Sequence, residues 1–298
     1  MPGLKEVRIR IASVKSTQQI TNAMKMVAAS KLRKAQNAII KLRPYAAKLN
    51  DIMQNLSGSM DNTSDSPFTH VRIAEKILLV VITSNRGLCG GFNSNIIKAT
   101  LNLLSTEYSE QLRKDNVTLI TIGRKGSEFF RKRGYNVVES HDDLFDKLTF
   151  DNVAPLAEQL MKAFAGKEYD RVQIIYNQFK NAAVQRLVVE QYLPILPVPP
   201  GPSAPDAMHT KHADYIFEPD QETILQLLIP KSLRIQLYKS LLDSFASEQG
   251  ARMMAMQQAT DNARELLRAL QISYNKARQQ SITKELLEIV AGAEALKG

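Results

Sequence analysis

Cysteine is almost absent from this sequence, since Cys89 is the only one among 298 residues. A single cysteine rules out an internal disulfide and argues against a zinc site. Long apolar runs are also missing: the longest, residues 77–82, has strand length, whereas a bilayer span needs about 20 apolar residues. The first residues contain no apolar signal segment and carry an early acid, Glu6. We therefore expect a soluble protein of a reducing compartment, without a secretory signal or transit peptide.

Acidic residues are scarce in the first 58 positions, where only Glu6 and Asp51 oppose 11 Lys and Arg, giving a net charge of +9. Residues 231–298 carry +3 and the remainder −3, so the +9 of the whole chain lies mainly along the first segment. A basic segment of this kind suits nucleic acid, anionic lipid or an acidic protein surface. A solvated face without a partner is the alternative.

Proline is absent between Lys231 and Leu296, and glycine occurs there only at Gly250 and Gly292. The segment is rich in residues that lose little side-chain entropy in a helix. Apolar or small residues recur at alternating steps of four and three, interrupted only by Gln249, and this spacing predicts a coiled-coil helix about 100 Å long that needs a partner. The repeating positions are Leu242, Ala246, Met253, Met256, Thr260, Ala263, Leu267, Leu270, Tyr274, Ala277 and Ser281.

The segment from Leu4 to Leu56 keeps a second heptad frame and supplies that partner. Its seam positions are Leu4, Val7, Ile11, Val14, Gln18, Thr21, Lys25, Ala28, Leu32, Ala35, Ile39, Leu42, Ala46, Leu49, Met53 and Leu56. Three polar residues interrupt the seam together, at 18, 21 and 25, and there the apolar Ile20, Met24 and Val27 lie off it. We interpret this interruption as a contact site for a third body, with a local stutter of the coil as the alternative.

The middle of the chain alternates strand and helix patterns between a polar linker at 57–69 and a proline-rich linker at 194–205. This order predicts a Rossmann-like α/β domain with a mainly parallel sheet and an antiparallel addition at its last two strands. The expected strands are 76–82, 117–122, 137–138, 171–179 and 186–192, and the expected helices are 95–112, 125–133 and 152–164, the last capped by Asn152. The predicted domains are the helix 1–58, the inserted α/β domain 70–215 and the helix 220–298, with the two helices paired antiparallel.

Candidate chemistry is sparse. The loop Ser84–Asn93 follows a strand and precedes a helix, but it has neither the Walker A nor the GxGxxG pattern, so a tight turn that needs glycine is the alternative to phosphate binding. His209 and His212 are spaced HxxH without a helix signature, and Cys89 is expected to be a small packed residue. We expect no catalytic residue, no cofactor and no metal.

Four stretches together carry a family resemblance: Ile20–Gln36, Ser84–Asn93, Ala246–Ala263 and Tyr274–Leu296. In sequence and order they resemble the gamma subunit of F-type ATP synthase over essentially the whole chain. The chloroplast-type insertion with a cysteine pair is absent, which indicates the bacterial type.

The resemblance implies a non-catalytic rotor shaft that couples proton-driven, or in some relatives sodium-driven, rotation of a membrane ring to ATP synthesis or hydrolysis. The implied partners are the alpha and beta subunits of the catalytic head, the epsilon subunit and the ring of c subunits, with no nucleic acid. The implied location is peripheral, at the cytoplasmic face of the bacterial inner membrane. A basic coiled-coil nucleic-acid-binding or scaffold protein, and a small nucleotide-binding enzyme, are the alternatives.

The resemblance also implies residues that contact the beta subunits. Met24, Lys25 and Ser30 fall in a segment that touches them, where the seam is interrupted. Arg86 matches an arginine that meets a beta-subunit carboxylate.

Further beta contacts are implied near the C-terminus. Arg278 and Gln279 match a pair that hydrogen-bonds a beta-subunit loop, and Arg252, Thr283 and Glu285 match positions linked to coupling. The last residues, 281–296, shift frame and are apolar on one face, which fits a sliding bearing against the surrounding ring.

Overall fold

The computed structural model describes residues 4–58, 67–195 and 221–295, which form two compact units. The first unit, here called the coiled-coil arm, consists of described residues 4–29 and 252–295. The second, here called the α/β body, consists of the described residues between 30 and 251. Two long helices, α1 (Leu4–Gly58) and α6 (Gln221–Ala295), contribute to both units.

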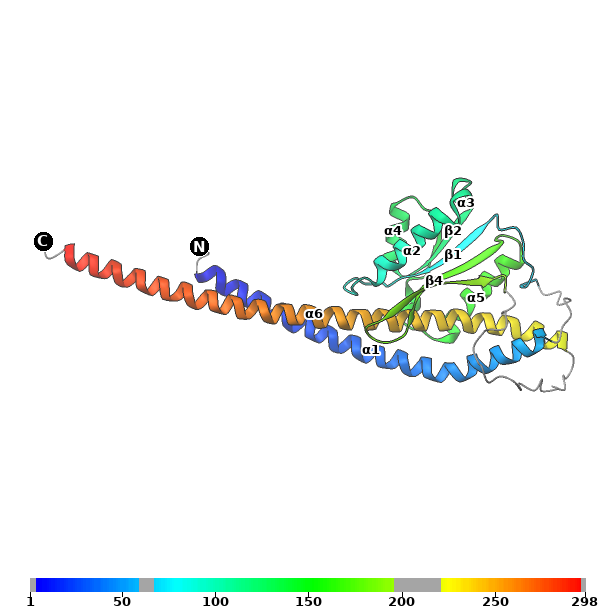
Figure 1. Cartoon of the computed structure of the whole chain (residues 1–298), viewed down its shortest axis with the longest axis horizontal. Helices are drawn as coiled ribbons and strands as arrows, with labels where there is room; N and C mark the ends of the chain where they lie inside the picture. The colour runs from blue at the N-terminus through cyan, green and yellow to red at the C-terminus, as the bar shows by residue number, and fades with distance from the viewer. Residues whose placement is uncertain (1–3, 59–66, 196–220, 296–298) are drawn as a thin grey trace, which may run out of the picture. The chain divides into compact units, whose positions relative to one another are not determined.

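The α/β body contains a five-stranded sheet with the strand order β3-β2-β1-β4-β5 (Figure 1). Strands β3, β2, β1 and β4 are parallel, and β5 pairs antiparallel with β4. The strands are β1 (Ile77–Ile82), β2 (Val117–Ile122), β3 (Val137–Ser140), β4 (Arg171–Phe179) and β5 (Gln185–Leu193). The helices are α2 (Phe92–Thr106), α3 (Ser109–Arg113), α4 (Arg124–Lys132), α5 (Phe150–Ala165) and the 3-10 turn η1 (Asp143–Phe145). The expected mainly parallel sheet with an antiparallel last strand is confirmed.

Both faces of the sheet are covered, and this explains the unbroken apolar run of β1. Leu78, Val80 and Ile82 point into one core, which α5 and residues 229–241 of α6 complete. Ile77 and Leu79 belong to the other core, with α2 and α4 (Figure 1). All six residues of β1 are buried, so this strand is the centre of the body.

Two local expectations for the body are wrong. A single helix over 95–112 was expected, but α2 ends at Thr106 and α3 begins at Ser109. The break places Tyr108 in the core at 2% exposure, so burial of this ring outweighs helix continuity. Asn152 was expected to cap the next helix, but α5 begins at Phe150 after Thr149, and the Asn152 side chain instead donates to the Lys147 carbonyl.

Helix α6 begins at Gln221 and contains Pro230, which precedes the first predicted seam position of this helix at Leu242. Proline normally breaks a helix interior because it lacks an N–H donor. On either side of it, Ile229 and Leu233 are buried in the core against the sheet. This packing explains why the helix continues through the proline.

The coiled-coil arm is an antiparallel helix pair. Thr21 bonds Thr260 and Lys25 bonds Gln257, so α6 numbers fall as α1 numbers rise. Every predicted seam position of α1 from Leu4 to Leu49 is buried or half-buried, and so is every predicted seam position of α6 from Leu242 to Ser281. The predicted two-helix coiled coil and both of its heptad frames are confirmed.

Candidate contact surfaces

The seam of the arm contains a polar layer where the heptad pattern is interrupted. The hydroxyls of Thr21 and Thr260 lie 2.8 Å apart and are buried, and Thr260 also donates to the Met256 carbonyl at 2.7 Å. Thr21 Oγ1 has the equivalent contact to the Gln18 carbonyl at 3.0 Å, so either hydroxyl can donate across the helix pair while the other donates to its own carbonyl. The polar residues therefore stay inside the seam and satisfy each other there.

Lys25 lies beside this layer and is held by the opposite helix. Its Nζ donates to Gln257 Oε1 at 3.0 Å, and Gln257 Nε2 donates to Asp261 Oδ2 at 2.7 Å. Arg264 completes the chain with an ion pair to the other Asp261 oxygen at 3.1 Å. Lys25 thus forms part of a polar brace between α1 and α6 instead of extending into solvent.

Apolar side chains of α1 lie outside the seam, as the sequence predicted. Ile20 and Val27 are each 56% exposed, and Met24 between them is half-buried. Ser30 is exposed as well, although it belongs to the α/β body. An exposed apolar strip beside a narrow seam is typical of a surface that another protein covers.

The C-terminal part of α6 is exposed over its whole circumference. Residues 282–295 are exposed at every position, and Arg278 and Gln279 are exposed just before them. Thr283 donates back to the Gln279 carbonyl at 2.9 Å, and Glu285 accepts from Ser281 at 3.4 Å, while Arg252 is half-buried. The apolar members of the predicted bearing face, and their neighbours, are among the exposed residues: Ile282, Leu286, Leu287, Ile289 and Val290.

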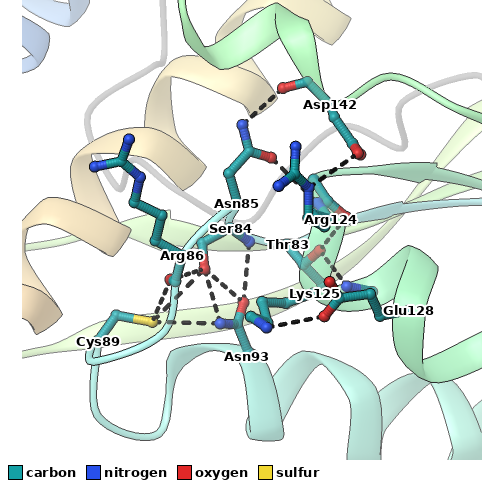
Figure 2. Close-up of polar contacts among 12 residues, drawn as sticks. Thr83, Ser84, Asn85, Arg86, Cys89, Asn93, Arg124, Lys125, Glu128 and Asp142 are labelled. Atoms are coloured by element: carbon teal, nitrogen blue, oxygen red, sulfur yellow. Dashed lines mark hydrogen bonds and ion pairs between the residues drawn. The ribbon is translucent and has the colours of Figure 1, made fainter.

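The loop that carries Arg86 is built on a compact hydrogen-bond network in the α/β body (Figure 2). Asn93 Oδ1 accepts from the Ser84 backbone N–H at 3.0 Å, and Asn93 Nδ2 contacts Ser84 Oγ at 2.8 Å and Cys89 Sγ at 3.4 Å. Ser84 Oγ donates to the Arg86 carbonyl at 2.7 Å. Cys89 is buried within this network, as expected, and Arg86 is exposed.

Two close approaches hold the base of this loop against the next strand–helix turn. Thr83 Oγ1 accepts the Gly126 N–H at 2.9 Å, and a Cβ on Gly123 would lie 2.2 Å from the Thr83 carbonyl oxygen. Asn85 bridges to the same region, because its amide donates to the Asp142 carbonyl and its oxygen accepts from the Arg124 N–H. Both turns are therefore fixed in shape from within the body.

The same geometry favours the tight-turn reading of this loop over phosphate binding. The Ser84 N–H is used by Asn93, and the Phe92 N–H donates to the Cys89 carbonyl at 3.3 Å. Strand order reverses between β1 and β4, where ligands bind in many open α/β sheets. Here α6 is packed beside the end of β4, because Ser247 donates to the Asn177 carbonyl and a Cβ on Gly250 would lie 3.2 Å from the Ala182 oxygen.

Among the residues that the structure describes, three non-glycine residues have a left-handed backbone: Leu88, Asp115 and Lys167. Asp115 and Lys167 each come just after the C-cap residue of a helix, and their N–H groups bond back to carbonyls of its last turn, which is the usual setting for this conformation. Leu88, with φ of 63°, lies in the loop before a helix begins. For an L-residue this backbone costs about 1–2 kcal/mol.

Sequence reasoning missed a group of buried polar residues on α6. Asp243, Glu248 and Gln249 are at most 6% exposed within the α/β body. Burial raises the pKa of the Asp243 carboxyl to about 6, although the charges of Lys239 and Arg43 act to lower it. The only sequence signal was Gln249, which interrupts an otherwise apolar row.

Neither a metal site nor a membrane span is found in the described parts of the chain. Nowhere there do three His, Cys, Asp or Glu side chains gather as a metal would require. The described helices also include no stretch long and apolar enough to cross a bilayer. His209 and His212 lie outside the described residues.

Comparison with known proteins decides the family. The family model described as ATP synthase matches residues 3–296. The ATP synthase gamma chain of Flavobacterium psychrophilum is 52% identical over 298 residues, covering 100% of both chains. That of Cytophaga hutchinsonii is 51% identical over 300 residues, covering 99% of both. The chain belongs to the ATP synthase gamma-chain family. It is a central-stalk subunit of F-type ATP synthase, and the nucleic-acid-binding alternative finds no support.

Solved structures agree with this family. A chain of the Euglena gracilis mitochondrial ATP synthase, in an OSCP/F1/c-ring structure, matches with a TM-score of 0.66 at 21% identity, covering 98% of this chain and 94% of that one. A chain of the Tetrahymena thermophila mitochondrial ATP synthase central stalk and c-ring matches with a TM-score of 0.56 at 27% identity, covering 80% and 99%. The first match supports the fold alone.

Proposed function

We propose that this chain is the non-catalytic turning shaft of its ATP synthase. It couples ion-driven rotation of a membrane ring to ATP synthesis or hydrolysis at the beta subunits, and it binds no nucleotide itself. The observation that carries the proposal is the exposed surface of the coiled-coil arm. Its apolar side chains outside the seam, among them Ile20, Val27 and Ile289, are more than half exposed, so surrounding proteins must cover them.

The proposed partners follow the division of the chain. Alpha and beta subunits surround the coiled-coil arm, and the beta subunits also reach Ser30 and Arg86 of the α/β body. The epsilon subunit and the ring of c subunits attach elsewhere on the α/β body; nucleic acid is not a partner. Proton is the proposed coupling ion, with sodium as the alternative. The bacterial gamma chains at about half identity support a peripheral location at the cytoplasmic face of the inner membrane. We keep 1–58, 70–215 and 220–298 as the proposed domain boundaries.

The proposed beta-subunit contacts are the nine residues that the family resemblance picked out: Met24, Lys25, Ser30, Arg86, Arg252, Arg278, Gln279, Thr283 and Glu285. Six of the nine are exposed, while Met24, Lys25 and Arg252 are half-buried. Lys25 is the weakest candidate for a direct contact, because Gln257 holds its ammonium. We propose that Lys25 acts mainly by bracing the two helices under the exposed strip of Ile20 and Val27.

Rotation requires contacts that are easily exchanged. Exposed ion pairs are worth about 0.2–1 kcal/mol each, so no single one holds a shaft in a deep energy minimum. The arm carries its cations on such exposed positions, including Arg278. Long cationic stems also cover apolar surface while their charges remain in water.

Asymmetry of the arm supplies the coupling. An antiparallel pair of unlike helices presents a different face to each beta subunit of a threefold ring. A contact shifts the equilibrium of a catalytic site only by the difference in its free energy between the states of that site. As the arm turns, each beta subunit meets a new face, and the state that this contact favours in that subunit changes. The synthesis and hydrolysis of ATP take place in the partner subunits.

Reconstitution tests this proposal. Purified alpha and beta subunits are mixed with the chain, and stoichiometric co-purification and ATP hydrolysis are measured, followed by ATP-driven ion pumping of the complete complex in vesicles. We expect a stoichiometric hydrolysing assembly and no turnover by the chain alone. ATP hydrolysis by the chain alone, or failure to assemble, contradicts the proposal.

The terminal contact is tested by Arg278→Ala. Arg268, an exposed cation on the same helix outside the proposed contacts, provides the matched control Arg268→Ala. We expect Arg278→Ala to lower ion pumping per ATP hydrolysed several-fold, while the helix content of the chain is unchanged by circular dichroism. Equal pumping by both variants removes Arg278 from the contact set.

A further inference from the structure

Leu88 combines two properties that do not serve the α/β body. Its backbone is left-handed, a conformation that glycine or asparagine adopts more easily, and its side chain is 64% exposed. The other two non-glycine residues with this backbone in the described part of the chain, Asp115 and Lys167, carry polar side chains and follow helix ends. Leucine at this position contributes little buried surface to the α/β body. Packing within the body therefore does not explain why an apolar side chain stands there, and contact with another protein does.

The loop beneath Leu88 has a fixed shape. The carbonyl of Arg86 accepts from Ser84 Oγ at 2.7 Å on one side, and Cys89 Sγ contacts Asn93 Nδ2 at 3.4 Å on the other (Figure 2). The backbone on both sides of Leu88 is thus anchored to the same buried network. A leucine side chain on such a loop is pre-organised, which lowers the entropy lost when a partner covers it.

We propose that Leu88 is the apolar contact residue of this loop and inserts into an apolar pocket of a beta subunit, next to the carboxylate that Arg86 meets. This inference rests on the proposed function, which assigns Arg86 to that carboxylate. Leu88 lies two residues from Arg86 on the same anchored loop, so a partner that reaches one reaches the other.

Charge around the loop supports a partner that combines carboxylates with an apolar pocket. The neighbouring turn adds two cations, Arg124 and Lys125, whose side chains are 62% and 42% exposed. Asp142 and Glu128 pair with them at 3.6 Å and 2.8 Å. Both side chains of the Lys125–Glu128 pair are exposed, and an exposed pair exchanges readily for another carboxylate. The surface around Leu88 therefore suits an acidic protein surface with an apolar pocket.

A binding titration with a matched control tests the proposal. Leu88→Gly relieves the left-handed backbone and removes the side chain, and Lys167→Gly relieves the same kind of backbone at an exposed site away from the loop. Because relief of strain and added chain entropy oppose each other, we expect both variants to unfold within about 3 °C of the unchanged chain.

We expect Leu88→Gly to bind the ring of alpha and beta subunits on the order of tenfold more weakly, as loss of one buried leucine predicts. Lys167→Gly should bind as the unchanged chain does. The same affinity for both variants overturns the proposal. A much larger loss of stability in Leu88→Gly than in Lys167→Gly also overturns it, because the leucine then serves the body itself.

A photo-reactive residue identifies the partner. p-Benzoylphenylalanine replaces Leu88 in one assembled complex and Val138, which is 56% exposed on β3, in another. Irradiation should join position 88 to a beta subunit, near an acidic residue, and position 138 should give no such product. A product with the epsilon subunit, or no product at 88, overturns the assignment. A different result would contradict the proposed function itself: failure of the unchanged chain to assemble with the alpha and beta subunits, or to couple ATP hydrolysis to ion pumping.

Discussion

The coiled-coil arm and the α/β body share two helices, yet these helices bury their side chains very differently in the two units. Within the body, ten of the eleven α6 residues from Ser240 to Gly250 are buried. Within the arm, α6 buries only its seam, and beyond Ala263 none of its described residues is fully buried. One continuous helix therefore serves as a core element at one end and as an exposed surface at the other.

This difference means that the body mainly determines the folding stability of the chain, whereas the arm mainly provides surface for contact with partner subunits. The body has two apolar cores around β1, so large effects on folding belong there. The arm has a single narrow seam with a polar layer at Thr21 and Thr260, so changes there alter the free energy of unfolding little. Substitutions in the arm should instead change binding to the partner subunits and coupling with them. A rotating shaft needs a stable body and an exposed contact surface of this kind.

The sharpest test of the rigid body is Gly123→Ala. The added Cβ would lie 2.2 Å from the Thr83 carbonyl oxygen, and φ is +101°, so the ends of β1 and β2 must separate. We expect a loss of more than about 4 kcal/mol in unfolding free energy, measured by urea denaturation. Gly87→Ala, where nothing lies within 4 Å, is the control and should cost under about 1 kcal/mol. Equal losses in both variants contradict the close approach.

The same truncation, leucine to alanine, can be made in each of the two units. Leu79→Ala removes a fully buried side chain from the body and should cost about 3–5 kcal/mol. Leu267→Ala removes a half-buried seam residue of the arm and should cost about 1 kcal/mol or less. Both are measured by thermal and urea unfolding. A seam truncation as costly as the core truncation shows that the arm is not the weaker unit.

Buried Asp243 makes the stability of the body depend on pH. Its pKa is about 6 in the folded chain against 3.8 for an ordinary aspartate. Between these values the folded chain keeps the proton that the unfolded chain has lost, so the unfolding free energy falls as pH rises from about 4 to 6. The loss is on the order of 2–3 kcal/mol and is complete above pH 6.

Asp243→Asn, which cannot ionise, should remove this fall and be more stable than the unchanged chain at pH 8 but not at pH 4. Urea unfolding at several pH values measures both slopes. Asp261→Asn, an exchange in the arm, is the control and should leave the slope in place. An unchanged slope in Asp243→Asn assigns the pH dependence to other groups.

The smallest effect is expected in the polar layer of the arm. Replacing both hydroxyls, in Thr21→Val with Thr260→Val, removes a satisfied pair without leaving an unpaired group. The double variant should therefore differ from the unchanged chain by less than about 1 kcal/mol, and a double-mutant cycle measures the coupling of the two residues. A loss of several kcal/mol in the double variant contradicts the view that the arm tolerates change.

Much of the fold could be predicted because its signals are local. The heptad frames of α1 and α6 give the seam, and the apolar run at 77–82 gives the central strand. The proposed contact residues came from motifs in the sequence. The break at Tyr108 and the polar brace on Lys25 could not be predicted, because each depends on segments far away in the chain. The start of α5 before Asn152 was missed for a local reason, because the Asn152 side chain bonds the Lys147 carbonyl instead of capping the helix.

The sequence alone determined the periodicity of the two long helices, the identity of the central strand and the family of the chain, because spacing and motifs are properties of neighbouring residues. Only the tertiary structure decided which core packing holds α6 together across Pro230, that Asp243 is buried and that Leu88 is held outward with a left-handed backbone. These outcomes depend on which distant surfaces meet. Packing against the sheet can outweigh a residue's local conformational preference of a few kcal/mol, and that packing cannot be predicted from the pattern of neighbouring residues alone.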